Sequence, residues 1–193
     1  MFSDLDRLRR IAHDVGPFQV IYGGKAHPQD EGGKGLIRRV FEAAEALKGV
    51  ATVVYVENYD MRWGQLLTSG ADVWMNTPKR PQEASGTSGM KAALNGVPSF
   101  SVLDGWWVEG HVEGVTGWSI GNRQEPAEDQ GSEISSLYDK LERVILPLYY
   151  GRPLGYAEVM RSTIALNGGF FNTQRMVQQY LANAYPWREQ KIE

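Results

Sequence analysis

Residues 18–56 read FQVIYGGKAHPQDEGGKGLIRRVFEAAEALKGVATVVYV, with one apolar run on each side of a helical pattern. The two runs are residues 18–22, which end at a pair of glycines, and residues 52–56. Both have the β-branched and aromatic composition of buried strands. Between them, apolar residues recur at helical spacing over 35–47. A strand, a helix and a second strand in this order predict two parallel strands joined by a crossover.

The alternation of strands and helices continues beyond this unit. The sequence predicts a helix over residues 61–67, a strand over 73–75, a helix that contains Lys91 and a strand over 99–103. An amphipathic helix over 2–12 precedes the first strand. Strands separated by helices indicate a parallel sheet that is covered on both faces. The expected fold is therefore a doubly wound, Rossmann-like α/β domain.

The end of the chain has a different pattern. It predicts a polar surface loop over 123–132 and then only helices, with a break at Pro147. These helices are expected over residues 134–145, 157–164 and 173–184. Because no linker or low-complexity tract separates the parts, we expect a single domain over 1–193. Its α/β core would span 1–121, and the helices over 133–187 would pack on that core.

The composition excludes several classes of protein. With a net charge of −3 and a pI near 5.7, the chain lacks the basic character of proteins that bind nucleic acid or an anionic membrane. It has no cysteine, hence no disulfide and no thiolate metal site. Its only histidines are His13, His27 and His111, so a zinc site has little support. No apolar run approaches the roughly 20 residues of a membrane span, and we expect a cytoplasmic protein.

Four loops that carry glycine or polar residues follow the predicted strands. They comprise residues 23–28, 57–60, 76–85 and 104–107. Because ligands of parallel α/β sheets bind beyond the carboxyl ends of the strands, we expect these loops to lie together at one edge. Lys25, in the first loop, could then point toward a shared cleft, and a solvated lysine is the alternative.

The stretch EASGTSGMKAALNG, residues 83–96, places small and hydroxylated residues before a helical pattern. Backbone N–H groups at a helix start attract an anion, and Gly86 and Gly89 would let that anion approach closely. Lys91 lies just inside this helix start and is the candidate for chemistry. An ordinary loop that enters a buried helix needs the same small residues, which is the alternative on composition alone.

The same stretch resembles the pyridoxal-phosphate attachment segment of glycogen and α-glucan phosphorylases, with Glu, Ala-Ser-Gly-Thr, Met-Lys and Asn-Gly in register. Asp104-Gly-Trp-Trp107 is similar to the short bacterial and archaeal members of that family. One departure is Ser88-Gly89, where the long-chain members have Gly-Asn. The resemblance implies the carboxyl-terminal lobe of a glycosyltransferase B fold. It also implies a fragment or isolated domain of an enzyme that needs an amino-terminal lobe as a partner.

This resemblance assigns cofactor roles to four residues. Lys91 would carry the cofactor, pyridoxal 5'-phosphate, as a Schiff base. Thr87 and Gly86 would hold the phosphate of the cofactor. Tyr59 would contact the cofactor ring, and a buried core aromatic is the alternative for this residue.

The resemblance also places a sugar site in the loop before the helix. Glu83, Ala84, Ser85 and Gly86 would bind the hydroxyls of the glucosyl unit, with Glu83 accepting charge-assisted hydrogen bonds. The implied reaction is phosphorolysis of an α-1,4-glucan or maltodextrin by orthophosphate, which releases glucose 1-phosphate. The basic residues that serve the phosphate lie upstream of this sequence in the family, so the isolated chain is expected to be inactive. A homo-oligomer is compatible with the resemblance.

Two functions of other classes stay open at this point. A nucleotide-sugar-dependent glucosyltransferase, such as a glycogen synthase, shares the fold and an acidic residue near the sugar. It needs no pyridoxal phosphate, and Met90-Lys91 argues against it. A non-catalytic Rossmann-like module would instead bind a small anion, or a partner lobe through an exposed strand edge.

Overall fold

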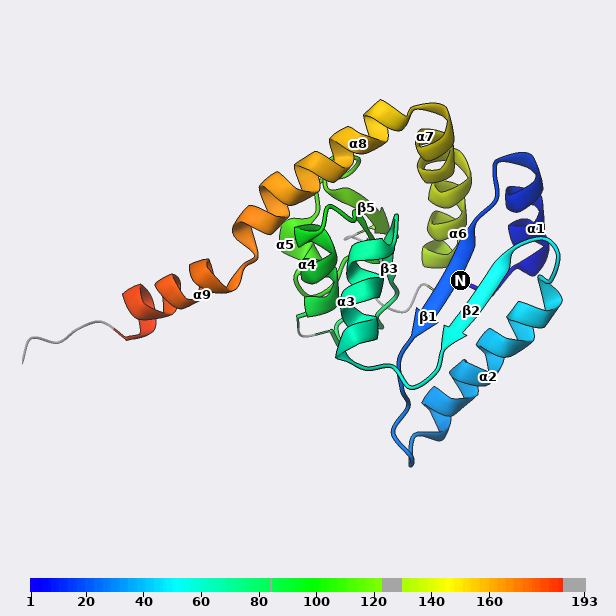
Figure 1. The fold of residues 1–193 in the computed structure, drawn as a ribbon, viewed down its shortest axis with the longest axis horizontal. Coiled ribbons are helices and arrows are strands. Elements are labelled where there is room, and N and C mark those ends of the chain that lie inside the picture. Colours follow the sequence, from blue (N-terminus) through cyan, green and yellow to red (C-terminus); the bar gives the residue numbers. More distant parts are fainter. Residues whose placement is uncertain (84, 123–129, 186–193) are drawn as a thin grey trace, which may run out of the picture.

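The computed structural model describes residues 1–83, 85–122 and 130–185. Within these residues, five parallel strands form two sheets, and helices pack around them (Figure 1). The α/β class and the parallel pairing of the strands are confirmed. The sequence predicts one parallel sheet, whereas the described strands form a sheet of two strands and a sheet of three.

The first sheet contains the strand, helix and strand unit that the sequence predicts. Strand β1, Gln19–Gly23, pairs with β2, Thr52–Val56, in parallel register from Gln19↔Thr52 to Gly23↔Val56. Helix α2, Glu31–Ala46, joins the two strands. It begins four residues earlier than expected because the Asp30 carboxylate accepts the backbone N–H of Gly33, which caps the helix.

The second sheet has the order β3-β4-β5. Its strands are β3, Trp74–Asn76, β4, Ser99–Val102, and β5, Gly117–Ile120. Helix α3, Met61–Gly70, precedes β3, and helix α4, Thr87–Leu94, connects β3 to β4. The sequence patterns predict β3 and β4 within one residue at each end but do not predict β5. Only two residues of β5, Trp118 and Ile120, are large and apolar, which is too short a pattern to indicate a strand, although all four residues are buried.

The helices after β5 follow one another with little interruption. They are α6, Gln130–Lys140; η1, a π-helical turn over Leu141–Ile145; α7, Leu146–Gly151; α8, Pro153–Ser162; η2, Thr163–Gly168; α9, Thr173–Gln179; and η3, Tyr180–Ala184. The break expected at Pro147 is absent, and the helix ends at Gly151 instead. The π turn explains this, because Leu146 donates its N–H to the Leu141 carbonyl five residues back. Such a widened turn accommodates a proline ring that would clash in a regular helix.

The main core lies around β4 and β5. Phe100 and Trp118 from these strands are 1% exposed, and the Trp118 ring stacks on Tyr156 of α8 at 6.1 Å. Helix α1, Leu5–Asp14, contributes Leu8 and Ile11, which are both fully buried. Helices α6 to α8 therefore contribute buried side chains to this core.

Helix α9 and the turn η3 behave differently from the rest of the tail. They contain no buried residue and extend away from the sheets (Figure 1). The expectation that residues 133–187 pack on the core is thus wrong for residues 173–184, and 186–187 lie outside the described residues. Their apolar side chains, among them Val177 and Leu181, face solvent in this chain.

A charged network holds the start of β5. The Glu113 carboxylate lies 2.7 Å from His111 Nε2 and 2.8 Å from Lys140 Nζ, and it accepts the backbone N–H of Ser119 at 3.0 Å. Burial acts to raise the pKa of Glu113, but these partners outweigh it and lower the pKa to about 2 from the ordinary 4.5. The folded state therefore favours the ionised carboxylate.

This network predicts a pH dependence of stability. Because the folded pKa of Glu113 is lower than the unfolded one, its stabilisation is complete above about pH 4.5 and is lost as the pH falls toward 2. The side chain is 45% exposed, so we expect only about 1–2 kcal/mol. Chemical unfolding should show Glu113→Gln less stable than the parent at pH 7 and equal to it near pH 2. A difference that stays constant with pH would contradict the assignment.

Candidate active site

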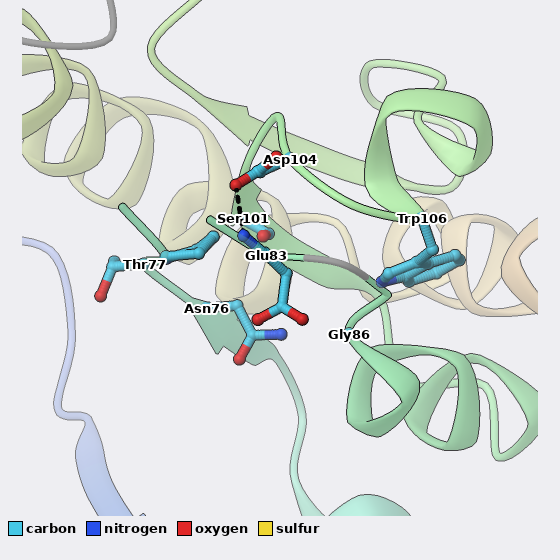
Figure 2. A pocket seen from close by; sticks show the side chains of 8 residues that line it. Asn76, Thr77, Glu83, Gly86, Ser101, Asp104 and Trp106 are labelled. Atoms are coloured by element: carbon cyan, nitrogen blue, oxygen red, sulfur yellow. Dashed lines mark hydrogen bonds between the residues drawn. The ribbon is translucent and has the colours of Figure 1, made fainter. Parts of the chain in front are cut away.

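A pocket of about 240 Å³ opens where β3 and β4 end (Figure 2). Its walls come from the two strand ends, the loop before α4 and the loop after β4. They consist of Asn76, Thr77, Pro78, Glu83, Gly86, Ser101, Asp104 and Trp106. Carboxyl ends of neighbouring parallel strands form the usual ligand site of an α/β sheet. Two of the four predicted loops, 76–85 and 104–107, therefore meet here.

Hydrogen bonds join the two loops at the pocket. The Asp104 carboxylate accepts the backbone N–H of Glu83 through Oδ2 at 3.0 Å, which Figure 2 shows as a dashed line. Its other oxygen, Oδ1, accepts the N–H of Gly105 at 3.0 Å. Farther along, Trp106 donates its backbone N–H to the Ser85 carbonyl at 2.9 Å. Both ends of the 83–85 segment are thus bound to the loop after β4.

Glycines allow these loops to approach so closely. Gly105 has φ +54°, and a Cβ at this position would lie 2.8 Å from the Ser85 carbonyl oxygen. Gly86 has φ +81° and directly precedes α4. A Cβ on Gly89 would lie 2.8 Å from Trp106 Nε1. Gly89 therefore makes room for the indole, whereas its position in the sequence suggests the approach of an anion.

Trp106 forms an apolar wall beside the polar groups of the pocket. The side chain is 5% exposed, and its ring meets Phe171 edge-on at 5.1 Å. Figure 2 shows the indole on one side of the pocket and the carboxylate of Glu83 pointing into it. An aromatic face combined with amide, hydroxyl and carboxylate groups suits a small ligand with many hydroxyls.

Helix α4 presents Thr87 and Lys91 on one face. The two residues are separated by four positions, which places them one above the other on a helix, and both are exposed. Ala92 and Ala93 are fully buried. Lys91 lies in the last turn of this short helix, one turn farther from the start than the sequence suggests. It is not among the residues that line the pocket.

The other predicted residues lie elsewhere. Tyr59 is half-buried, and its ring lies against Gly23 at the end of β1, where a Cβ would be 2.8 Å from Tyr59 Cδ2. Lys25 is exposed. Neither residue lines the pocket. Ala84 lies outside the described residues.

The pocket contains one residue that the sequence patterns do not place at a ligand site, Ser101. Asn76, Thr77 and Trp106 lie in the loops expected to bind a ligand, but the patterns assign no individual role to them. Ser101 lies next to the end of β4. A polar residue near the carboxyl end of an otherwise apolar strand is the signal that could have identified it.

Two general features bear on the kind of site. Within the described ranges, no group of three or more His, Asp or Glu side chains could hold a metal ion. None of the described helices is long and apolar enough to cross a membrane. The pocket itself is lined by amide, hydroxyl and carboxylate side chains, from Asn76, Thr77, Ser101, Glu83 and Asp104.

Comparisons with known proteins identify a family for the chain. The family model described as carbohydrate phosphorylase matches residues 2–118. Maltodextrin phosphorylase of Thermococcus litoralis is 42% identical over 189 residues, which cover 96% of this chain and 23% of the relative. Glycogen phosphorylase of Aquifex aeolicus is 38% identical over 191 residues, which cover 96% of this chain and 28% of the relative. Glycogen phosphorylase of Mycobacterium tuberculosis is 39% identical over 194 residues, which cover 96% of this chain and 22% of the relative. The chain spans about a quarter of the length of these relatives.

Proposed function

This chain belongs to the carbohydrate phosphorylase family, and from this we propose that it forms the carboxyl-terminal, Rossmann-like lobe of an α-glucan phosphorylase with a glycosyltransferase B fold. The proposed reaction is phosphorolysis of an α-1,4-glucan or maltodextrin. Orthophosphate gives a proton to the glycosidic oxygen, the glycosidic bond breaks, and a phosphate oxygen forms the new bond to the anomeric carbon. The products are glucose 1-phosphate and a shortened glucan. The observation that carries the proposal is the pocket, in which Glu83 faces a polar cavity at the strand ends.

The pocket offers a binding mode for the terminal glucosyl unit. Glu83 is exposed, and one of its oxygens accepts only a long hydrogen bond, from the Ser85 N–H at 3.3 Å. Its carboxylate thus retains lone pairs for sugar hydroxyls, and such charge-assisted bonds are stronger than neutral ones. Asn76 and Thr77 add donors and acceptors to the same pocket, and Trp106 adds an apolar wall. In this proposal these residues orient the sugar, and Glu83 contributes most to its affinity.

Helix α4 supplies groups that fit pyridoxal phosphate. The exposed amine of Lys91 lies on the same face as the exposed Thr87 hydroxyl, one helical turn away. The start of the helix follows Gly86 and offers backbone N–H groups to a phosphate. A molecule that carries both an aldehyde and a phosphate can therefore use both ends of this face. When bound, it supplies a phosphate that exchanges a proton with the substrate phosphate. Tyr59 and Lys25 are proposed only as more distant contributors, since neither lines the pocket.

Further parts of the proposal concern partners and location. We propose that the other half of the cleft comes from an amino-terminal lobe, because the relatives extend well beyond the matched segment. A cytoplasmic enzyme agrees with a sequence that has no cysteine. A homo-oligomer is compatible with the same evidence.

A chimera provides the test of the proposed function. The chain should replace the matching 189-residue segment of the Thermococcus litoralis maltodextrin phosphorylase, which supplies the rest of the enzyme. We expect the purified chimera to release glucose 1-phosphate from maltodextrin only when orthophosphate is present. A folded chimera that shows no phosphorolysis would contradict the proposal. Binding of maltodextrin or phosphate without turnover would then favour the non-catalytic module.

A charge-removing substitution tests the sugar site. We expect Glu83→Gln in the chimera to lower kcat/KM for maltodextrin by at least about tenfold, since a hydrogen bond to a charged group contributes roughly 1.5–3 kcal/mol. The pyridoxal phosphate content should stay unchanged. Glu42→Gln, at an exposed position of α2, serves as the control and should leave the kinetics unaltered. Normal kinetics for Glu83→Gln with full cofactor would show that Glu83 does not bind the substrate.

A further inference from the structure

Asp104 is half-buried at the inner edge of the pocket, and both of its carboxylate oxygens accept backbone N–H groups. One N–H belongs to Gly105 in its own loop. The other belongs to Glu83, 21 positions earlier in the chain. A carboxylate that accepts two backbone donors is held in one orientation. Asp104 thus connects its own loop directly to the residue that carries the proposed sugar-binding carboxylate.

A second contact makes the connection rigid. Trp106 donates its N–H to the Ser85 carbonyl, and its indole fills the space left by Gly86 and Gly89. Gly105 stands between these anchors with φ +54°, where a side chain would collide with the Ser85 backbone. The 83–86 segment is therefore fixed by the loop after β4 at its first residue and again at Ser85.

We propose that Asp104 is a positioning residue that holds the backbone of Glu83 so that the Glu83 carboxylate points into the pocket. This role rests on the proposed function, because it assumes that Glu83 binds the sugar. Asp104 acts through Glu83 and needs no contact with the substrate. Without the carboxylate, the N–H of the exposed Glu83 loses its partner, and the segment before α4 is anchored only from Ser85 onward.

Kinetics of a double-mutant cycle in the chimera distinguish positioning from a general structural role. We expect Asp104→Ala to lower kcat/KM at least about tenfold with unchanged pyridoxal phosphate content. In the Glu83→Gln background the same change should cost no more than about twofold, because residues that act through one another are non-additive. Asp104→Asn, which keeps one acceptor oxygen, should give an intermediate loss. Equal losses in both backgrounds, or no loss from Asp104→Ala, would overturn the proposal.

Asp30→Ala is the matched control for stability. Asp30 is also a carboxylate that accepts a backbone N–H, from Gly33 at 2.8 Å, but it lies at the start of α2 and does not line the pocket. Its substitution should lower the melting temperature while kcat/KM stays within about twofold of the parent. A loss of kcat/KM in Asp30→Ala equal to that in Asp104→Ala would mean that lowered stability alone explains the effect.

Amide exchange tests the geometry without any activity measurement. In the 193-residue chain, NMR should show slow hydrogen exchange at the Glu83 amide, although this residue is exposed. Exchange should become at least about tenfold faster in Asp104→Ala, and the Gly33 amide should not change. Rapid exchange at Glu83 in the unmodified chain would overturn the proposal even if the chimera is active. Protected exchange with an inactive chimera would instead place the failure in the proposed function.

Discussion

Replacing Lys91 by alanine is expected to abolish covalent attachment of pyridoxal phosphate to the chimera. The amine of Lys91 is exposed on the face of α4 that also carries Thr87. Its removal takes away the group that would form the Schiff base with the cofactor aldehyde. Phosphorolysis should fall by at least about 10²-fold, the loss typical of removing a preorganised electrostatic group. Borohydride reduction followed by peptide mass spectrometry measures the attachment directly.

Other lysines supply the controls for this experiment. Lys48→Ala, at an exposed position after α2, should retain the full adduct. The reduced adduct of the parent protein should map to the peptide that contains Lys91. An adduct that persists in Lys91→Ala, or that maps to Lys25, Lys34 or Lys79, would contradict the assignment.

Replacing Gly117 by alanine is expected to produce the largest loss of stability in the chain. Gly117 opens β5 with φ +144°, and a Cβ there would lie 2.0 Å from the Ser99 carbonyl oxygen in β4. The strained backbone costs about 1–3 kcal/mol, and moving the neighbouring strand costs a similar amount. We therefore expect a loss of about 3 kcal/mol or more, which lowers the melting temperature by roughly 6–12 °C.

Gly151→Ala is the matched control for the glycine substitution. Gly151 ends α7, and among the described residues nothing outside its chain neighbours and its own helix backbone lies within 4 Å of a Cβ built there. Thermal unfolding followed by circular dichroism should show this variant unchanged or slightly more stable, because alanine reduces the entropy of the unfolded chain. Equal melting temperatures for Gly117→Ala and the parent protein would show that β4 and β5 are not paired as described.

Much of the local structure could be predicted from the sequence. Strands β1 and β2 appear at the predicted positions because apolar runs bounded by polar or glycine residues favour extended structure. Helices α1 and α3 begin where Asp4 and Asp60 accept the backbone N–H of a residue three positions later. These signals involve partners only a few residues apart, so the local sequence contains them.

Other elements depend on packing and had no local signal. Strand β5 has only two large apolar residues, Trp118 and Ile120, and all four of its positions are buried through pairing with β4 and packing in the core. Pro147 does not break the helix because the preceding π turn absorbs the proline ring. Helix α9 has apolar residues at helical spacing, yet it contacts too little of the described chain to bury any of them.

The candidate site likewise has features that follow from local sequence and features that depend on the tertiary structure. The sequence by itself determined that Lys91 lies in a helix that follows small and hydroxylated residues, since these residue types are typical of a helix start. Only the tertiary structure decided that Asp104 holds Glu83, that Trp106 occupies the space beside Gly89, and that Tyr59 lies against Gly23 outside the pocket. A helix turn closes through hydrogen bonds between near neighbours, which residue types alone can indicate. The pocket closes only when β3 and β4 pair and bring together loops far apart in the chain, a long-range contact that no local pattern encodes.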